Sequence, residues 1–182
     1  MDFERLERNI CDNIIEAQLK LGYEKLPLSL NYTISSLGNL LGRKMDAADM
    51  QYVLFQFALY VQPALGQLTF RPIKDGFCIT VPEEGTAFVH ENCGGDGFMK
   101  DFIDIVRGHC SSVEQVLDVF RKYSGNVSAE EVNNGEFDYL VRFSDGIPDE
   151  YLYCLSVEEE IDGSVHVTYH RFIKEDYEEL GF

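Results

Sequence analysis

The sequence predicts an α+β protein, and two kinds of periodicity support this class. Residues 2–21 repeat apolar side chains at three- and four-residue spacing, which is typical of an amphipathic helix. Residues 137–143 alternate apolar and polar side chains, which is typical of a half-buried strand. With 45% hydrophobic and 13% aromatic residues, the chain of 182 residues can bury a core, and this excludes a disordered acidic tail.

The charge of the chain is unevenly distributed. Residues 1–82 hold 8 basic and 9 acidic side chains, whereas residues 83–182 hold 7 basic and 23 acidic ones, for a net charge of −17. Residues 83–97 are rich in glycine and acidic side chains. We therefore expect an N-terminal unit at 1–82, a junction at 83–97 and an acidic α+β unit at 98–182.

The first unit begins with the signals of a helix, a strand and a second helix. Gly22 ends the helix of residues 2–21, and the alternation of residues 28–32 predicts a short strand. A short helix at 34–42 follows, with Thr33 as its N-cap.

A longer helix and a hairpin complete this unit. The helix is expected from Asp46, its N-cap, to about Gln62, where Pro63 would end it. Two β-rich runs at 67–73 and 77–81 then flank an Asp-Gly turn, which is a strong hairpin signal.

This order of elements resembles the winged helix-turn-helix fold. The resemblance rests on Ser35-Ser36-Leu37-Gly38 through Leu41-Gly42, followed by a helix and a hairpin. It implies that the third helix would enter the major groove of DNA and present polar and basic side chains there.

The third helix does not fit that role. It has two acidic residues and no basic one, and residues 52–61 are apolar nearly all round, so we expect it to be buried on every face. The nearby cations are Arg43 and Lys44 before the helix and Arg71 and Lys74 on the wing. Binding of nucleic acid is therefore an unfavoured prediction, because phosphate contacts need several basic side chains.

The second unit is expected to combine a helical pair with a three-stranded antiparallel meander. The helices are predicted near 97–107 and from 113, and the strands at 137–143, 151–157 and 165–169. The helices would cover one face of the sheet, and residues 174–180 would form a short closing helix.

The candidate reactive residues form no recognisable catalytic or metal motif. His109-Cys110 lacks the arginine that a cysteine-phosphatase loop needs six residues later. His90 and Cys93 have a metal-like spacing, but the adjacent His109 and Cys110 make a poor second pair for zinc. His166 and His170 lie about 13 Å apart along one strand, too far for one metal. We therefore predict no catalytic, cofactor-binding or metal-binding residues.

Three segments resemble an uncharacterised bacterial family, a domain of unknown function found among gut Firmicutes. They are residues 59–66 (Leu-Tyr-Val-Gln-Pro-Ala-Leu-Gly), residues 81–91 and the end of the chain from Tyr169 to Phe182. The resemblance implies a stand-alone cytoplasmic bacterial protein and brings no activity or site residues.

The expected compartment is a reducing cytoplasm, and no membrane association is predicted. The five cysteines are odd in number and widely spaced, and residues 1–5 show no secretory signal. Glutamines and Pro63 interrupt the longest uncharged stretch, residues 50–70, so we interpret it as a core helix and a strand.

The leading functional hypothesis is a non-enzymatic protein-interaction or regulatory module that binds a protein partner or itself. One alternative is a DNA-binding transcription regulator that uses Arg43, Lys44, Arg71 and Lys74. The other is an enzyme with a pocket between the units near His90, Cys93 and His109.

Overall fold

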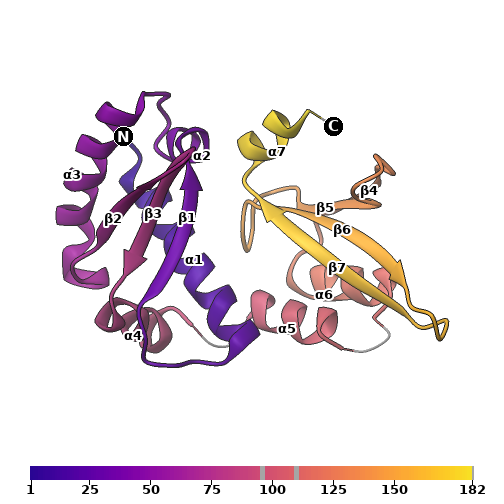
Figure 1. The fold of residues 1–182 in the computed structure, drawn as a ribbon. Helices are drawn as coiled ribbons and strands as arrows, with labels where there is room; N and C mark the ends of the chain where they lie inside the picture. The colour runs from indigo at the N-terminus through magenta and orange to yellow at the C-terminus, as the bar shows by residue number, and fades with distance from the viewer. Residues whose placement is uncertain (95–96, 109–110, 182) are drawn as a thin grey trace. The chain divides into compact units, whose positions relative to one another are not determined.

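The computed structural model describes residues 1–94, 97–108 and 111–181 and divides into two compact units, Met1–Gly95 and Asp96–Phe182. Each unit combines helices with an antiparallel sheet, so the expected α+β class is confirmed (Figure 1). The two units are described separately below.

The first unit has the order helix, strand, helix, helix, hairpin and helix. Its elements are α1 (Phe3–Leu21), β1 (Leu28–Thr33), α2 (Ile34–Leu40), α3 (Ala47–Leu65), β2 (Thr69–Ile73), β3 (Gly76–Val81) and α4 (Glu83–Asn92). Both N-caps that the sequence predicts in this unit are confirmed: the Thr33 side chain accepts a hydrogen bond from Ser36 N, and the Asp46 side chain accepts one from Asp49 N. Helix α4 follows Pro82 and has no side-chain cap.

The sheet of this unit has the strand order β1-β3-β2, so the two edges are β1 and β2. Both neighbours of β3 run antiparallel to it, with Tyr32 opposite Phe77 and Arg71 opposite Cys78. Pro72 lies within the edge strand β2.

Helices α1, α2 and α3 bury their apolar stripes in one core with the sheet. The side chains with at most 1% exposure include Leu6, Ile10, Ile14, Leu37, Leu40, Met50, Leu54, Phe57, Val61, Ile79 and Val81. The Asn9 side chain is a polar group buried in this core: Tyr32 Oη donates to Asn9 Oδ1 at 2.9 Å, and Asn13 Nδ2 donates to the same oxygen at 3.0 Å. The buried amide oxygen of Asn9 is therefore satisfied.

Helix α3 is longer than expected. Pro63 does not end the helix but lies in its last turn, and the chain leaves it at Gly66, whose φ is +71°. A proline this close to the C-terminus removes one helical N–H bond, while Gly66 N still donates to Gln62 O at 3.1 Å. The positive φ of Gly66 is the stronger stop signal.

Residues 83–92, which we expected in a junction, form helix α4 within the first unit. Glu83 and Glu84 lie in its first turn, where negative charge stabilises the positive end of a helix. The Thr86 hydroxyl donates to Leu26 O at 2.9 Å, and Gln18 Nε2 donates to Thr86 O at 2.9 Å. These two bonds attach α4 to α1 and to the segment before β1.

The second unit has two helices, a sheet and a closing helix. Its elements are α5 (Phe98–Val106), α6 (Val113–Tyr123), β4 (Val127–Glu131), β5 (Tyr139–Phe143), β6 (Leu152–Glu159), β7 (Val165–Phe172) and α7 (Lys174–Leu180). The four strands lie in the order β4-β5-β6-β7, all antiparallel. The prediction of a three-stranded meander was wrong by one strand, because the edge strand β4, with the sequence Val-Ser-Ala-Glu-Glu, has only one large apolar residue to signal it.

An aromatic cluster forms the core of this unit. Phe98 and Phe102 on α5, Phe120 on α6 and Tyr153 on β6 are all at most 5% exposed. Ring centroids of Phe120 and Tyr153 lie 5.1 Å apart, and those of Phe98 and Phe120 lie 4.8 Å apart, both edge to face. The helices α5 and α6 thus cover one face of the sheet, as Figure 1 shows.

Gly85 offers a test of how α4 packs on α3. A Cβ at this position would overlap the Leu65 carbonyl oxygen and would lie 2.7 Å from Val81 Cγ1. We expect Gly85→Ala to lower the free energy of unfolding by about 2 kcal/mol, because backbone atoms cannot move aside as a flexible side chain can. Urea unfolding measures this loss. Gly125→Ala is the control, since its Cβ would meet open space; equal effects of the two variants would contradict the packing described here.

Candidate functional site

Helix α3 exposes an apolar face, contrary to the expectation that it is buried on every side. Tyr52, Phe55 and Leu59 are 67%, 61% and 74% exposed. They recur at three- and four-residue spacing and so lie along one side of the helix. The core packs against the other side of α3 alone, and this leaves these three side chains in contact with solvent.

We define the outer α3 face as Tyr52, Phe55, Gln56 and Leu59. It is free of charge, because the sequence carries no charged residue from Met50 to Phe70. It continues onto the sheet, since the rings of Phe55 and Phe70 on β2 meet edge to face at 6.4 Å. A neutral, aromatic surface that spans a helix and an adjacent strand is typical of a binding surface.

The four cations that the sequence singled out all lie outside α3. Arg43 and Lys44 precede α3, Arg71 lies on β2 and Lys74 lies in the turn between β2 and β3; all four are exposed. The exposed side of α3 itself carries no basic side chain. The helix that would read bases in a winged helix-turn-helix protein therefore presents aromatic and aliphatic groups.

A second cluster joins two thiols from distant parts of the first unit. Cys11 lies on α1 and Cys93 is the C-cap of α4, and each thiol shifts the pKa of the other. Burial, then Cys93, Glu7 and Asp12, raises the pKa of the Cys11 thiol to about 12. Burial, then Asp12 and Glu7, also raises the pKa of Cys93, while the hydrogen bond from Cys11 lowers it. Sequence analysis missed Cys11 as a partner because 82 positions separate it from Cys93.

His90 lies one turn before Cys93 but is engaged elsewhere. Its ring stacks on Tyr23 with centroids 3.8 Å apart and an interplanar angle of 4°. His109, the third residue of the expected enzyme pocket, and Cys110 lie outside the described residues. The three cavities described next are lined by neither His90 nor Cys93.

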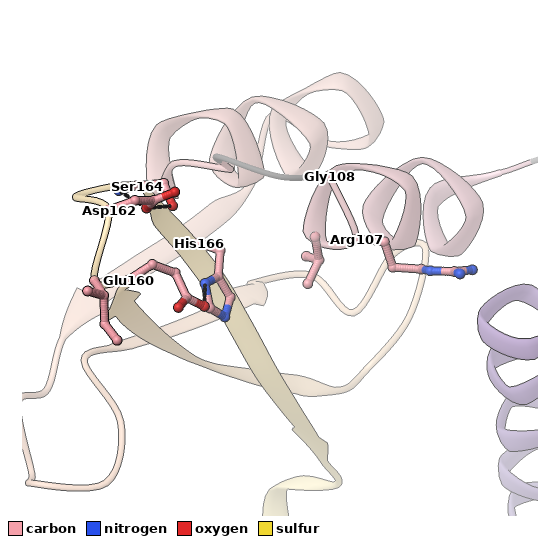
Figure 2. Close-up of a pocket in the computed structure, with 8 residues that line it drawn as sticks. Arg107, Gly108, Glu160, Asp162, Ser164 and His166 are labelled. Atoms are coloured by element: carbon pink, nitrogen blue, oxygen red, sulfur yellow. Dashed lines mark hydrogen bonds and ion pairs between the residues drawn. The ribbon is translucent and has the colours of Figure 1, made fainter.

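The largest of these cavities, about 600 Å³, lies in the second unit (Figure 2). It is lined by Val106, Arg107, Gly108, Glu160, Ile161, Asp162, Ser164 and His166. His166 Nε2 lies 3.3 Å from Glu158 Oε2, and Nδ1 lies 3.4 Å from Glu160 Oε1. Figure 2 shows the Arg107 side chain turned away from His166, so the two do not converge on one ligand position.

The histidines of β7 serve packing and pairing. Because each nitrogen of His166 faces a different carboxylate, one metal ion cannot take both carboxylates together with the ring. His170 packs between Phe137 and Phe172, with centroids 5.7 and 6.2 Å away. Among the described residues, no group of three histidine, cysteine or acidic side chains could hold a metal ion.

The smaller cavity of the first unit, about 260 Å³, is mainly apolar. Its lining comprises Ala17, Gln18, Leu21, Gly22, Glu24, Leu26, Pro27, Leu28 and Thr86. Gln18 Nε2 donates to Thr86 O and the Thr86 hydroxyl donates to Leu26 O, so both polar side chains of the lining bond to protein backbone. The third cavity, lined by Met1–Glu4, Leu41, Gly42 and Tyr60, is an open depression beside the start of α1.

Comparison with known proteins gives one match. The model of a family described as "Domain of unknown function, E. rectale Gene description (DUF3877)" matches residues 3–181. No curated protein and no solved structure matches the chain. Across the part of the chain that the structure describes, no helix is long and apolar enough to cross a membrane.

The thiols allow a test of this geometry by alkylation. We expect iodoacetamide to modify exposed Cys93 much faster than buried Cys78 and Cys154. Because the pKa of Cys93 is raised, little thiolate exists at neutral pH, and its rate should rise about tenfold per pH unit from about pH 7 to about pH 9. Peptide mass spectrometry measures each rate. The unfolded chain in urea is the control, in which the differences among sites should vanish; equally fast modification of Cys154 in the folded chain would contradict its burial.

Proposed function

Starting from a chain that belongs to the DUF3877 family, to which no function is assigned, we propose that the protein is a non-enzymatic interaction module. The outer α3 face is the observation that carries this proposal. Through it, two copies of the chain associate and bury Tyr52, Phe55 and Leu59 against each other. The scaffold beneath this face has the winged-helix form.

The topology of the first unit supports the winged-helix assignment. Winged helix-turn-helix domains follow the order helix, strand, helix, helix and hairpin, and this unit repeats that order before α4. The hairpin β2–β3 takes the place of the wing, with Lys74 and Asp75 in its turn, and β1 pairs with β3 on the other side. In this scheme, α3 is the helix that faces the ligand.

The chemistry of α3 favours apolar contacts over phosphate contacts. Aromatic and aliphatic side chains gain free energy when they leave water, at roughly 25 cal/mol per Å² of apolar surface. A phosphate backbone, in contrast, is bound by lysine and arginine, which the exposed side of α3 lacks. Tyrosine and phenylalanine are also among the residues enriched in protein interfaces.

A second copy of the chain suits this face because of its neutrality. In an isologous contact the same surface meets itself, so any charge would lie close to its own copy. The outer α3 face carries none, although the chain as a whole has a net charge of −17. The exposed amides of Gln51 and Gln56 contain donors and acceptors, so they can pair with the same groups on the second copy.

The proposal also places the protein in the cytoplasm. Cys11, Cys78, Cys93 and Cys154 are all free thiols, and thiols persist in this form in a reducing compartment.

Self-association can be tested by placing a charge on the outer α3 face. We expect the wild-type chain to form a dimer, and Phe55→Glu and Leu59→Glu each to weaken it at least about tenfold, or ~1.4 kcal/mol, because a carboxylate would be desolvated and would face its own copy. Sedimentation velocity over a concentration series measures the dissociation constant.

The matched control is Leu21→Glu, which adds the same charge at another exposed leucine of the same unit, 84% exposed at the end of α1. It should dimerise as the wild type does. A wild-type chain that stays monomeric at every concentration, or equal weakening by Leu21→Glu, would refute association through α3.

DNA binding is the alternative that the exposed cations favour. If Arg71 and Lys74 bound phosphates, the wild-type chain would shift duplex DNA at low salt and the double variant Arg71→Ala/Lys74→Ala would not. We expect no salt-dependent shift with either protein, because α3 presents no basic side chain. A shift that the double variant abolishes would replace our proposal with a nucleic-acid-binding one.

A further inference from the structure

Strand β1 forms one edge of the first sheet. In the order β1-β3-β2 it pairs with β3 (Figure 1). Ile34 N, directly after β1, donates to Asp75 O at 3.0 Å and continues the register of these two strands. Backbone groups alternate in direction along an antiparallel ladder, so the N–H and C=O groups of Ser29 and Asn31 point away from β3. Both residues are exposed, and their backbone donors and acceptors therefore lie at an open edge.

The other sheet edges in the described part of the chain each carry a protective feature. Strand β2 contains Pro72, which has no N–H to offer, and the short strand β4 ends with Glu130 and Glu131. On β7, Val167 N donates to Ser111 Oγ at 3.1 Å, so a side chain already occupies that part of the edge. The sequence of β1, Leu-Ser-Leu-Asn-Tyr-Thr, contains neither proline nor a charged residue. An edge left open among protected ones indicates a place where another strand pairs.

An apolar cavity lies at the beginning of this open edge. The cavity of about 260 Å³ is lined by Leu28, the first residue of β1, by Leu26 and Pro27 before it, and by Ala17 and Leu21 on α1. Side chains of a strand alternate between the two faces of a sheet. A side chain of an added strand that points to the same face as Leu28 can therefore enter the cavity, where it contacts aliphatic groups.

The cavity also has a negative group in its lining. Glu24 is exposed and lines the cavity, whereas the neighbouring Lys25 is not part of the lining. The chain as a whole has a net charge of −17, which attracts cationic partners over longer distances. A segment with a basic side chain close to an aliphatic one thus complements both the charge and the apolar lining of the cavity.

We propose that β1 binds an extended peptide segment of another protein. The segment adds to the sheet as a fourth strand and forms backbone hydrogen bonds with Ser29 and Asn31, which supply affinity. One aliphatic side chain fills the cavity, and a lysine or arginine two positions away, on the same face of the strand, pairs with Glu24. These two side chains supply the selectivity.

This site is separate from the outer α3 face. The outer α3 face adjoins β2, and β1 lies at the opposite edge of the same sheet. Peptide binding at β1 therefore goes beyond self-association through α3 and does not depend on it. The variant Phe55→Glu separates the two proposals, because it should weaken the dimer and bind peptide as the wild type does.

The test uses the full-length ¹⁵N-labelled chain and the synthetic peptide acetyl-Thr-Lys-Thr-Leu-Thr-Lys-Thr-amide. Lysines on both sides of the leucine allow the peptide to bind in either strand direction. At saturating peptide, we expect amide hydrogen exchange to slow at least about tenfold at Ser29 and Asn31 and to stay unchanged at Leu30, whose N–H faces β3. Heteronuclear NMR measures exchange at each residue, and the titration gives the dissociation constant.

Two changes test the backbone bonds and the cavity separately. Asn31→Pro removes an outward N–H and leaves the ladder to β3 intact, so it should raise the dissociation constant at least about tenfold. Asn31→Ser keeps this N–H and is the matched control, which should bind as the wild type does. A peptide with serine in place of its leucine should bind the wild-type chain at least about tenfold more weakly, because the cavity loses its aliphatic occupant.

Circular dichroism of each variant shows whether it is folded before peptide is added. The comparison of the two peptides uses the wild-type chain and so does not depend on the folding of a variant. Unchanged exchange at Ser29 and Asn31, or equal affinity for the two peptides, would overturn the proposal. So would a peptide-free dimer that Asn31→Pro weakens in sedimentation velocity, because β1 would then pair with a second copy of the chain.

Discussion

The packing of α3 against α1 and the sheet is the interaction on which the first unit depends. Phe57 is fully buried and meets the ring of Phe3 edge to face at 5.6 Å, which joins the two longest helices of the unit. An α-helix advances about 100° per residue, so a helix fixed at Leu54, Phe57 and Val61 must direct Phe55 and Leu59 away from the core. The exposed apolar face is therefore a geometric consequence of the buried one.

Much of the fold could be predicted from the sequence because local signals were strong. The stripe of residues 2–21 lies within one residue of α1, and the Asp-Gly turn correctly placed the hairpin of β2 and β3. The failures occurred where tertiary contacts decide. Strand β4 has a single large apolar residue and forms because it can pair with β5. Helix α4 forms in a glycine-containing segment that the sequence predicts as a junction, but Gly85 instead allows α4 to pack closely against the end of α3. Proximity of Gly85 to Leu65 cannot be inferred from neighbours along the chain.

The candidate sites were less predictable than the fold, for two physical reasons. Composition shows that residues 52–61 are apolar. It does not show how much of the surface of this helix the rest of a small unit can cover. Contacts across long sequence separations are also invisible in the sequence. His90 on α4 stacks on Tyr23, which follows α1, and Cys93 raises the pKa of Cys11 although 82 positions separate them. That His166 and His170 share one face of β7, in contrast, could be predicted from strand periodicity, because residues two apart on a strand share a face.

The edge strand β2 limits how copies of this chain can meet. A β-sheet with a free edge invites another strand to add to it, the usual route to open-ended aggregation. Pro72 has no N–H, and its position opposite Phe77 in an intact ladder requires that its nitrogen face away from β3, toward that free edge. The edge thus lacks a donor beside the outer α3 face, so backbone strand addition is disfavoured next to the most apolar surface of the unit. In the proposed self-association, this favours a contact made by side chains, which can close on itself, over one that propagates by strand addition.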